Sequence, residues 1–344
     1  MKRLVLMFPG QGSQYVGMGA CLYKGSPVAR KVFEEVDECL GSFVSREMFS
    51  GTVESLSRTI ITQPALLAHS VSIFRCLEED FCVNLKPSWL LGHSVGEYAA
   101  LVCAGSLSLS AAARLIYARG EAMQAAADAC PSPCTMQALL FAPPPEVGNE
   151  RKALHDLQAF VHTACQESSQ VCKGVVGIAA LNSPTQVVLS GHTHAVEHAT
   201  GLLGRSGSHP KLRRSVKLPV SAPFHSPIMA PAAEVLQGAL TGGPPLGPCA
   251  TPLVAGLHAR PVTSPADLEV ALVRGVVSPV QWGSCVSKVV EENGGVNGVH
   301  FLEMGGVVGG TLGSLVKLCF RGATTTSLST LDALHALAKS RLLE

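Results

Sequence analysis

A serine flanked by two glycines, between an apolar run and a helical segment, is the feature that most constrains the fold of this chain. Residues 89–91 predict a short buried strand, and residues 97–104 have the composition of a helix. Between them, Gly92-His93-Ser94-Val95-Gly96 has the G-x-S-x-G form of a nucleophile elbow, a tight turn that exposes the serine hydroxyl. An ordinary turn that contains a serine is the alternative. The order strand, turn, helix favours the elbow and indicates an α/β fold.

The chain begins with a second strand and loop of related design. Residues 4–8 are all apolar and predict a buried strand that leads directly into Pro9-Gly10-Gln11-Gly12-Ser13-Gln14. This loop is not a dinucleotide fingerprint, because Tyr15 stands where the third glycine of G-x-G-x-x-G belongs. A glycine-flanked turn at a strand end can instead present a backbone amide to an active site. We therefore expect Gln11 and Val95 to be candidate amide donors to an oxyanion.

The distribution of apolar runs predicts two structural units. Strands that alternate with helices of about ten to fifteen residues indicate a doubly wound α/β unit. From about residue 134, short strand-like runs among two helical segments predict a small α+β insertion. We therefore expect a catalytic domain of residues 1–133 and 218–344 and an inserted subdomain of residues 134–217. In the first unit, Ser110 is the expected N-cap of a helix that runs to about residue 127.

Composition and charge exclude several classes of function. With 47% apolar and 15% charged residues the chain can build a sizeable core, and a formal net charge of +1 argues against nucleic acid as the partner. The apolar runs are too short for a membrane span or a signal peptide, so no membrane association is expected. The 12 cysteines include no C-x-x-C pair, and the nearest two are Cys130 and Cys134. They predict a reducing compartment in which cysteines serve as small core residues.

A catalytic serine needs a base, and His225 stands in the most suitable setting of the 12 histidines. It lies in residues 218–226, an extended segment with two prolines that can hold an imidazole rigidly over an elbow. His192, His194 and His198 form a second group, two of them one helical turn apart. This group lacks a fourth ligand at a suitable spacing, so we expect no zinc site there and no metal in the protein.

Arg119 is unusual because it lies on an otherwise apolar helical face, with Leu115, Ile116 and Met123 at the same spacing. One explanation is that its stem covers apolar surface while its guanidinium reaches water or a buried acid. The other is that the guanidinium lies in a dry pocket and binds the carboxylate of a ligand. Periodicity alone leaves both explanations open.

Taken together, these motifs resemble the malonyl-CoA:acyl carrier protein transacylases, acyltransferases of fatty acid and polyketide synthesis. The matching segments follow the order of that family over nearly the whole chain: Phe8-Pro9-Gly10-Gln11-Gly12-Ser13-Gln14, Thr62-Gln63-Pro64-Ala65, Gly92-His93-Ser94-Val95-Gly96-Glu97-Tyr98, Arg119-Gly120-Glu121-Ala122-Met123, Asn182-Ser183-Pro184, Phe224-His225 and Pro279-Val280-Gln281-Trp282. The resemblance implies an α/β-hydrolase-like large domain with a parallel sheet, an inserted ferredoxin-like subdomain, and the active site between them.

The resemblance also implies a role for each matching residue. Ser94 would be the acylated nucleophile, His225 its general base and acid, and Gln281 would orient the imidazole through its main-chain carbonyl. The Gln11 and Val95 amides would form the oxyanion hole. The substrate-binding residues would be Arg119, which would hold the malonyl carboxylate, together with Gln63, Asn182, Phe224 and Met123; the bulk of Phe224 would exclude an α-methyl group.

The reaction that the resemblance implies is transfer of malonyl from malonyl-CoA to the phosphopantetheine thiol of acyl carrier protein. It would proceed through an acyl-serine in ping-pong order, without a cofactor of the enzyme's own, and would supply extender units for fatty acid synthesis. The basic residues Lys211, Arg213, Arg214 and Lys217 would meet the acidic carrier protein, and a solvated strand edge is the alternative.

Two other functions compete with this one. A serine thioesterase or esterase of the α/β-hydrolase type would share the elbow, but no acid between Ser94 and His225 has a recognisable setting for orienting the base. An adaptor that had lost its activity would not need to retain Ser94, His225 and Arg119 together. We expect a monomer in the mitochondrial matrix, with a plastid or the bacterial cytoplasm as alternatives.

Overall fold

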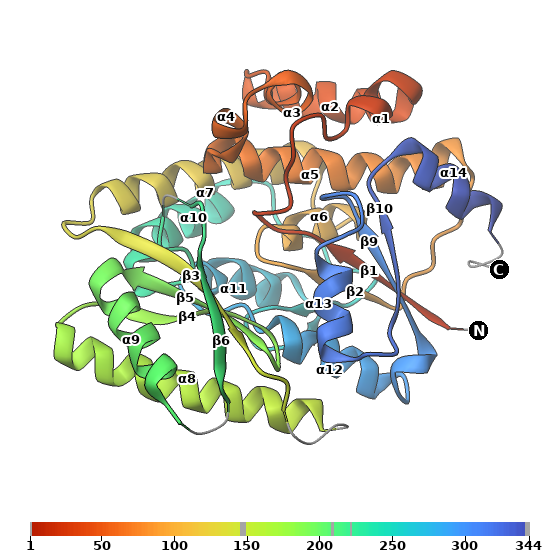
Figure 1. Ribbon diagram of the computed structural model, residues 1–344. Helices are drawn as coiled ribbons and strands as arrows, with labels where there is room; N and C mark the ends of the chain where they lie inside the picture. Colours follow the sequence, from red (N-terminus) through yellow and green to blue (C-terminus); the bar gives the residue numbers. More distant parts are fainter. Residues whose placement is uncertain (1, 145–148, 208–209, 221, 341–344) are drawn as a thin grey trace.

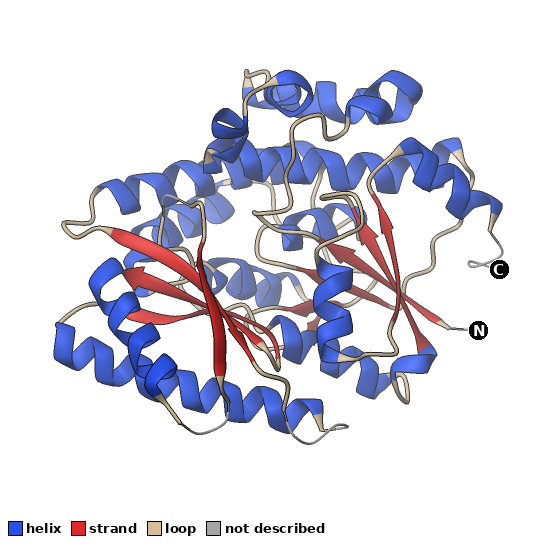
Figure 2. Cartoon of the chain, viewed as in Figure 1, coloured by secondary structure: helices blue, strands red, loops and turns tan. Residues whose placement is uncertain are grey.

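Two separate β-sheets organise the computed structural model, which describes residues 2–144, 149–207, 210–220 and 222–340. Figure 2 shows the two groups of strands with helices around them. The larger sheet has the strand order β10-β9-β1-β2-β7-β8, and the smaller has the order β4-β5-β3-β6. The fold is therefore α/β with a mixed sheet and a separate antiparallel sheet.

The larger sheet contains the buried apolar strands at residues 4–8 and 89–91. Its strands are β1 (Arg3–Phe8), β2 (Trp89–Gly92), β7 (Leu253–Ala255), β8 (Arg260–Val262), β9 (Val299–Met304) and β10 (Thr324–Leu328). All neighbours pair in parallel except β7 and β8, which are antiparallel. Because helices cover both faces of a parallel sheet, its central strands read as continuous apolar runs. The predicted strands at residues 4–8 and 89–91 belong to this sheet.

The smaller sheet is formed by β3 (Cys134–Phe141), β4 (Val176–Ser183), β5 (Gln186–His192) and β6 (Leu212–Lys217), all paired antiparallel. Helix α8 (Glu150–Cys172) follows β3 and α9 (Thr193–Arg205) follows β5, so the order is β-α-β-β-α-β. Both helices lie on the outer side of this sheet (Figure 1). Its inner face contributes Met136, Ala138 and Val188 to the main core.

The remaining helices surround the larger sheet. They are α1 (Ala20–Gly25), α2 (Pro27–Leu40), α3 (Val44–Ser50), α4 (Val53–Ser57), α5 (Thr59–Arg75), the π-helix η1 (Cys76–Asp80), α6 (Gly96–Cys103), α7 (Leu109–Asp128), η2 (Pro227–Met229), α10 (Ala230–Gly242), α11 (Pro265–Gly275), α12 (Trp282–Glu292), η3 (Val296–Gly298), α13 (Leu312–Cys319) and α14 (Leu331–Lys339). Figure 1 shows α1 to α4 grouped beside α5.

One helix is long and apolar enough to cross a membrane by length and composition. It is the continuous segment Thr59–Asp80, and 78% of its most apolar window is buried inside the protein. Packing on both sides accounts for its apolar character, since it contacts α2, α6, α7 and β9.

The start of α7 differs from the prediction. Ser108, not Ser110, is the N-cap, because Ser108 has extended backbone angles and its hydroxyl accepts the Ala111 N–H at 3.1 Å. The Ser110 hydroxyl donates instead to Glu35 at 2.8 Å. The helix runs on to Asp128, so its stripe of apolar residues still places Arg119 on the buried face.

Candidate active site

The turn that carries Ser94 has the backbone geometry of an elbow. Ser94 lies between β2 and α6 with a φ of 54°, in the left-handed region that residues with a side chain seldom adopt. Packing requires the two glycines, because a Cβ at Gly96 would overlap the Phe8 carbonyl and one at Gly92 would overlap the Glu97 backbone. Phe8 and Gly92 are register partners on neighbouring strands, so this crowding follows from the sheet itself.

His225 contacts the Ser94 hydroxyl directly. Its Nε2 lies 2.8 Å from Ser94 Oγ, and its Nδ1 lies 2.8 Å from the Gly275 carbonyl oxygen and 3.1 Å from that of Ser278. Since a carbonyl oxygen only accepts hydrogen bonds, Nδ1 carries the ring proton and Nε2 is left to accept one from the hydroxyl. The pair is therefore arranged for proton transfer from Ser94 to His225.

The prediction that the Gln281 carbonyl orients this imidazole is wrong. That carbonyl accepts the Cys285 N–H at 2.9 Å, as the first hydrogen bond of α12, and the Gln281 N–H donates to Gly256. Gly275 and Ser278 take the role because they lie at and just beyond the end of α11. The last carbonyls of a helix have no partner within the helix and are free to accept another donor.

Arg119 completes the group around the serine. It is 4% exposed, its Nη2 donates to Ser94 Oγ at 3.2 Å, and its Nη1 donates to Gln63 Oε1 at 2.8 Å. No carboxylate of the described residues lies within ion-pair distance of this guanidinium. Of the two explanations for the buried arginine, snorkelling to water does not fit, because the whole side chain is enclosed.

Burial sets the protonation of the groups near Ser94. It lowers the pKa of His225 to about 3, and the positive charge of Arg119 acts in the same direction. Burial also raises the pKa of Glu97 to about 7, against the opposing effects of a hydrogen bond from the Gly256 N–H and of Arg119. His225 is therefore a neutral base at physiological pH, and Glu97 is a weak counter-charge for Arg119.

Ser94, His225 and Arg119 line one cavity of about 540 Å³. The larger unit supplies Ser94, Val95, Arg119, Gln63 and the Gln11 loop, and the smaller sheet supplies an apolar wall. Eight of the predicted site residues lie on its surface: Gln11, Gln63, Ser94, Val95, Arg119, Asn182, Phe224 and His225. The predicted residues thus converge from distant parts of the chain on a single space.

Gln11 and Val95, the two residues predicted to supply amides to an oxyanion, both line the cavity that contains Ser94. The N–H groups of Gly96, Glu97 and Tyr98 are bonded to the carbonyls one turn before them, and within the described residues the Val95 N–H has no such acceptor. Gln11 lines the same cavity from the loop after β1, and its side chain donates to Thr59 at 3.4 Å.

Met123 does not take the position predicted for it. It is fully buried, does not line the cavity, and its sulfur lies 3.9 Å from Gln63 Nε2, behind that side chain. It lies one helical turn beyond Arg119 on α7, so helical spacing placed it on the correct face but too deep. Its contact is with a residue that itself contacts Arg119, and not with the cavity.

Sequence and structure comparisons agree with this geometry. A model of the acyl transferase domain family matches residues 5–135. A malonyl CoA-acyl carrier protein transacylase of Bacillus subtilis is 35% identical over 329 residues, 96% of this chain and 94% of that protein. The chain belongs to the malonyl CoA-acyl carrier protein transacylase family.

Solved structures of malonyl CoA-acyl carrier protein transacylases have the same fold as this protein. The enzyme from Coxiella burnetii aligns with a TM-score of 0.85 and 31% identity, covering 100% of this chain and 98% of that one. A malonyl-transacylase in complex with a type II PKS acyl-carrier protein aligns with a TM-score of 0.84 and 32% identity, covering 97% and 98%. The likeness therefore extends over both sheets of the transacylase.

Sequence reasoning missed a contact that joins the two units of this transacylase. His93, inside the elbow, lies with its Nε2 3.0 Å from Asn182 Oδ1 on β4, and the Asn182 amide donates to Gln186 at 3.2 Å. Neither a histidine inside a turn nor an asparagine on a strand signals such a pairing. The carbonyls of Gly275 and Ser278 were also missed, because every residue has a backbone carbonyl and the sequence does not distinguish these two.

The histidines considered for zinc do not form a metal site together in the transacylase. His198 Nδ1 lies 2.9 Å from the Ser168 hydroxyl, whereas His192 lies beside Cys130 and Cys134. Within the described residues, the group with the spacing of metal ligands consists of Cys130, Cys134 and His192. It lies outside the cavity that contains Ser94.

Proposed function

We propose that this protein transfers the malonyl group of malonyl-CoA to the phosphopantetheine thiol of acyl carrier protein. The observation that carries the proposal is the contact of both His225 and Arg119 with the Ser94 hydroxyl on one cavity wall. A serine with a neutral base is suited to accept an acyl group, and an enclosed guanidinium without an ion-pair partner among the described residues is suited to bind the acid at its far end. The relatives, which are named as transacylases of this kind, support the same reaction.

The first half-reaction acylates Ser94. His225 Nε2 takes the hydroxyl proton as the oxygen attacks the thioester carbonyl, and the amides of Val95 and Gln11 stabilise the oxyanion. The N-terminal end of α6 adds a favourable dipole there. When the intermediate collapses, the carbon–sulfur bond breaks and His225 returns the proton to the leaving thiolate of coenzyme A.

The second half-reaction transfers the group to the carrier. The phosphopantetheine thiol gives its proton to His225 and attacks the malonyl ester, and the proton then returns to Ser94 as the ester bond breaks. Ser94 is restored, so the acyl group changes carriers with no cofactor of the enzyme's own. The Gly275 and Ser278 carbonyls hold the imidazole in the required tautomer throughout.

Arg119 supplies the selectivity for a dicarboxylic acyl group. The two nitrogens of its guanidinium that point toward Gln63 and Ser94 are fixed in direction, which suits bidentate binding of a carboxylate near the reacting carbonyl. Phe224 lines the cavity immediately before His225, and its bulk leaves little space for an α-methyl substituent. We assign Gln63 to positioning Arg119, and Asn182 to the wall contacted by the pantetheine arm.

The basic edge of the smaller sheet is the proposed docking site for the carrier. Lys211, Arg213, Arg214 and Lys217 are exposed on or beside β6, the edge strand, and none forms an ion pair with a described residue. The chain continues from β6 to Leu218 and Val220, which line the cavity. An acidic carrier bound at this edge would therefore hold its phosphopantetheine beside the entrance.

The order of strands and helices supports a finer description of the fold. The strand-turn-helix unit around Ser94 supports the α/β-hydrolase-like label, and the β-α-β-β-α-β order supports the ferredoxin-like one. β3 begins at Cys134 and β6 ends at Lys217, in keeping with an insertion of residues 134–217 in a domain of residues 1–133 and 218–344.

The relatives of this protein include bacterial proteins, which supports the bacterial cytoplasm as its compartment and not the mitochondrial matrix. The monomeric state stays a prediction.

Intact-mass spectrometry tests the proposal most directly. Mixed with malonyl-CoA, the protein should gain one malonyl group, located on Ser94, and should lose it when holo acyl carrier protein is added. The carrier should gain the same mass in equal amount. Release of free malonate in place of carrier loading would favour the thioesterase alternative, and absence of an adduct would overturn the proposal.

A further inference from the structure

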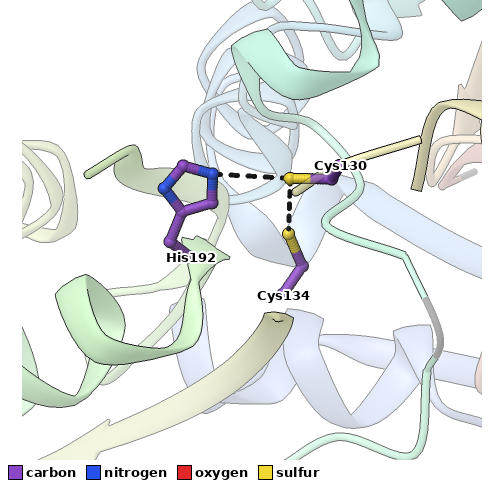
Figure 3. A group of neighbouring side chains, drawn as sticks. All are labelled: Cys130, Cys134 and His192. Carbon is purple, nitrogen blue, oxygen red and sulfur yellow. Dashed lines mark hydrogen bonds between the residues drawn. The ribbon is translucent and has the colours of Figure 1, made fainter. Parts of the chain in front are cut away.

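A second group of reactive side chains lies where the chain passes from the larger to the smaller unit. Helix α7 ends at Asp128, a short linker with two prolines follows, and β3 begins at Cys134. Cys130 lies in the linker and Cys134 is the first residue of the strand. His192, the last residue of β5, is the register partner of Cys134 (Figure 3). The proposed transfer reaction uses none of these three residues.

The two sulfurs and the ring are in contact. Cys134 Sγ lies 3.4 Å from Cys130 Sγ, and Cys130 Sγ lies 3.5 Å from His192 Nε2, as the dashed lines in Figure 3 mark. The Cys134 thiol also faces the Ser132 carbonyl at 3.3 Å. All three residues are partly exposed, so a small solute can reach them. No other pair of cysteine sulfurs in the described residues makes such a contact.

The position of the ring proton distinguishes thiol chemistry from metal binding. The Val175 N–H donates to His192 Nδ1 at 3.1 Å, so Nδ1 is an acceptor and the proton of the neutral ring lies on Nε2. Nε2–H then points at Cys130 Sγ as a hydrogen-bond donor. A metal at Nε2 would need that lone pair, and would move the proton to Nδ1 against the Val175 N–H.

The surroundings of His192 favour a neutral ring. Burial, together with the neighbouring His194, lowers the pKa of His192, which favours the neutral ring. The two imidazoles stack with centroids 5.7 Å apart. Burial raises the pKa of Cys134, and its contact with Cys130 adds to this effect. Cys134 therefore keeps its proton while Cys130, which faces two donors, is the sulfur placed to react.

We propose that Cys130 and Cys134 form a reversible dithiol–disulfide pair whose oxidant is hydrogen peroxide. The Cys130 thiolate attacks one peroxide oxygen, the O–O bond breaks, and the leaving hydroxide takes a proton to become water. Cys134 sulfur then attacks the sulfenic acid at Cys130, the S–O bond breaks, and its oxygen leaves as a second water with the Cys134 proton. Two thiols are oxidised, one peroxide is reduced to two waters, and a thiol reductant reverses the change.

Peptide mapping can test this pair in isolation from the other cysteines. Trypsin cleaves after Arg119 and Arg151, with no lysine or arginine between, and residues 120–151 contain Cys130 and Cys134 as their only cysteines. After limited hydrogen peroxide and alkylation of free thiols, this peptide should be unlabelled and about 2 Da lighter than the dithiol form. Treatment with a thiol reductant before alkylation should restore two labels.

Matched variants assign the roles. Cys134→Ser should stop at a sulfenic acid on Cys130 that dimedone traps, and Cys130→Ser should give neither product. Cys82→Ser, at an exposed cysteine elsewhere, should leave disulfide formation unchanged. His192→Phe should slow the reaction of Cys130 about tenfold by removing the Nε2–H donor, whereas His194→Phe should slow it less than about twofold.

Two results would overturn the proposal. One is that both cysteines of the peptide stay labelled while thiols elsewhere are oxidised at the same peroxide dose. The other is that Zn²⁺ added alone binds one equivalent per chain, survives dialysis, protects both thiols from alkylation and loses its affinity in His192→Phe. That second result would assign the group to a metal site.

Discussion

The two walls of the active-site cavity are built on different physical grounds. The wall from the larger unit holds Ser94 by backbone crowding and a positive φ, and His225 by carbonyls at the end of a helix. The wall from the smaller sheet consists mainly of apolar side chains such as Met136, Ala138 and Val188, with a basic outer edge. We infer that the first wall performs the chemistry and tolerates little change, whereas the second recognises the carrier and tolerates much more.

The largest effect is expected at the nucleophile. Ser94→Ala removes the oxygen that both His225 and Arg119 contact, so malonyl transfer should fall by at least about 10⁴-fold while the fold is retained. The matched change on the other wall, Val188→Ala in β5, should alter the rate less than about twofold. Steady-state loading of acyl carrier protein measures both, and comparable losses would remove the distinction between the walls.

The second effect is expected on the selectivity between malonyl and acetyl groups. Arg119→Ala should reduce malonyl transfer by roughly 10²- to 10³-fold, because it removes the cation that we propose binds the free carboxylate, and should spare or raise acetyl transfer. Arg114→Ala, an exposed arginine on the same helix, is the control and should affect neither. Rates with malonyl-CoA and acetyl-CoA decide the point; equal losses for the two acyl groups would contradict the assignment.

The third prediction compares the backbones of the two units. Gly96→Ala places a Cβ against the Phe8 carbonyl and should lower the free energy of unfolding by about 3 kcal/mol or more. Gly177→Ala on β4 meets no atom within 4 Å and should change it by less than about 1 kcal/mol. Urea denaturation followed by circular dichroism gives both values. A similar loss in the two variants would show that the elbow is not specially crowded.

The fourth effect is expected at the basic edge of the smaller sheet, the proposed docking site for acyl carrier protein. Reversing two charges, Arg213→Glu with Arg214→Glu, should raise the KM for acyl carrier protein about tenfold and weaken its salt dependence. The rate of Ser94 acylation by malonyl-CoA should not change, because that half-reaction does not involve the carrier. Stopped-flow acylation and steady-state transfer separate the two steps. An unchanged KM would leave β6 as a solvated strand edge.

The smallest effect is expected on changing pH. The pKa of His225 is lowered to about 3 in the folded protein, so the imidazole stays neutral as pH falls through 6.5, the usual value for histidine. In a Glu97→Gln variant, which removes the titration of Glu97 near pH 7, the kcat/KM for acylation should therefore vary less than about twofold between pH 8 and pH 5.5. A half-maximal point near pH 6.5 in the acylation profile would falsify this protonation state.

Residues with a distinctive chemistry could be predicted without coordinates. Ser94 was found from its glycines, His225 from its proline-pinned segment and Arg119 from its place on an apolar face, and the structure brings the three together. The carbonyls at Gly275 and Ser278 could not be found this way, because a backbone oxygen has no sequence signal. Gln281 was assigned in their place, although the start of α12 already uses its carbonyl.

Predictions from local spacing failed where the position of a side chain depends on its depth in the fold or on neighbouring elements. Met123 has the helical spacing of Arg119, but it lies behind Gln63 and not in the cavity. Cys130 and Cys134 were interpreted as small core residues, and the half-exposed contact with His192 depends on the pairing of β3 with β5. Each of these outcomes depends on which elements lie next to one another.

The sequence by itself determined the elbow, the α/β fold and the three side chains that meet at the Ser94 hydroxyl. It did so because apolar periodicity, glycine at crowded turns and charged residues on buried faces are local constraints. The tertiary structure alone decided which carbonyls orient His225, which side chains reach the cavity surface and how the cysteine pair meets a histidine. Those relations join residues far apart in the chain, and packing brings such residues together only when the whole fold has formed.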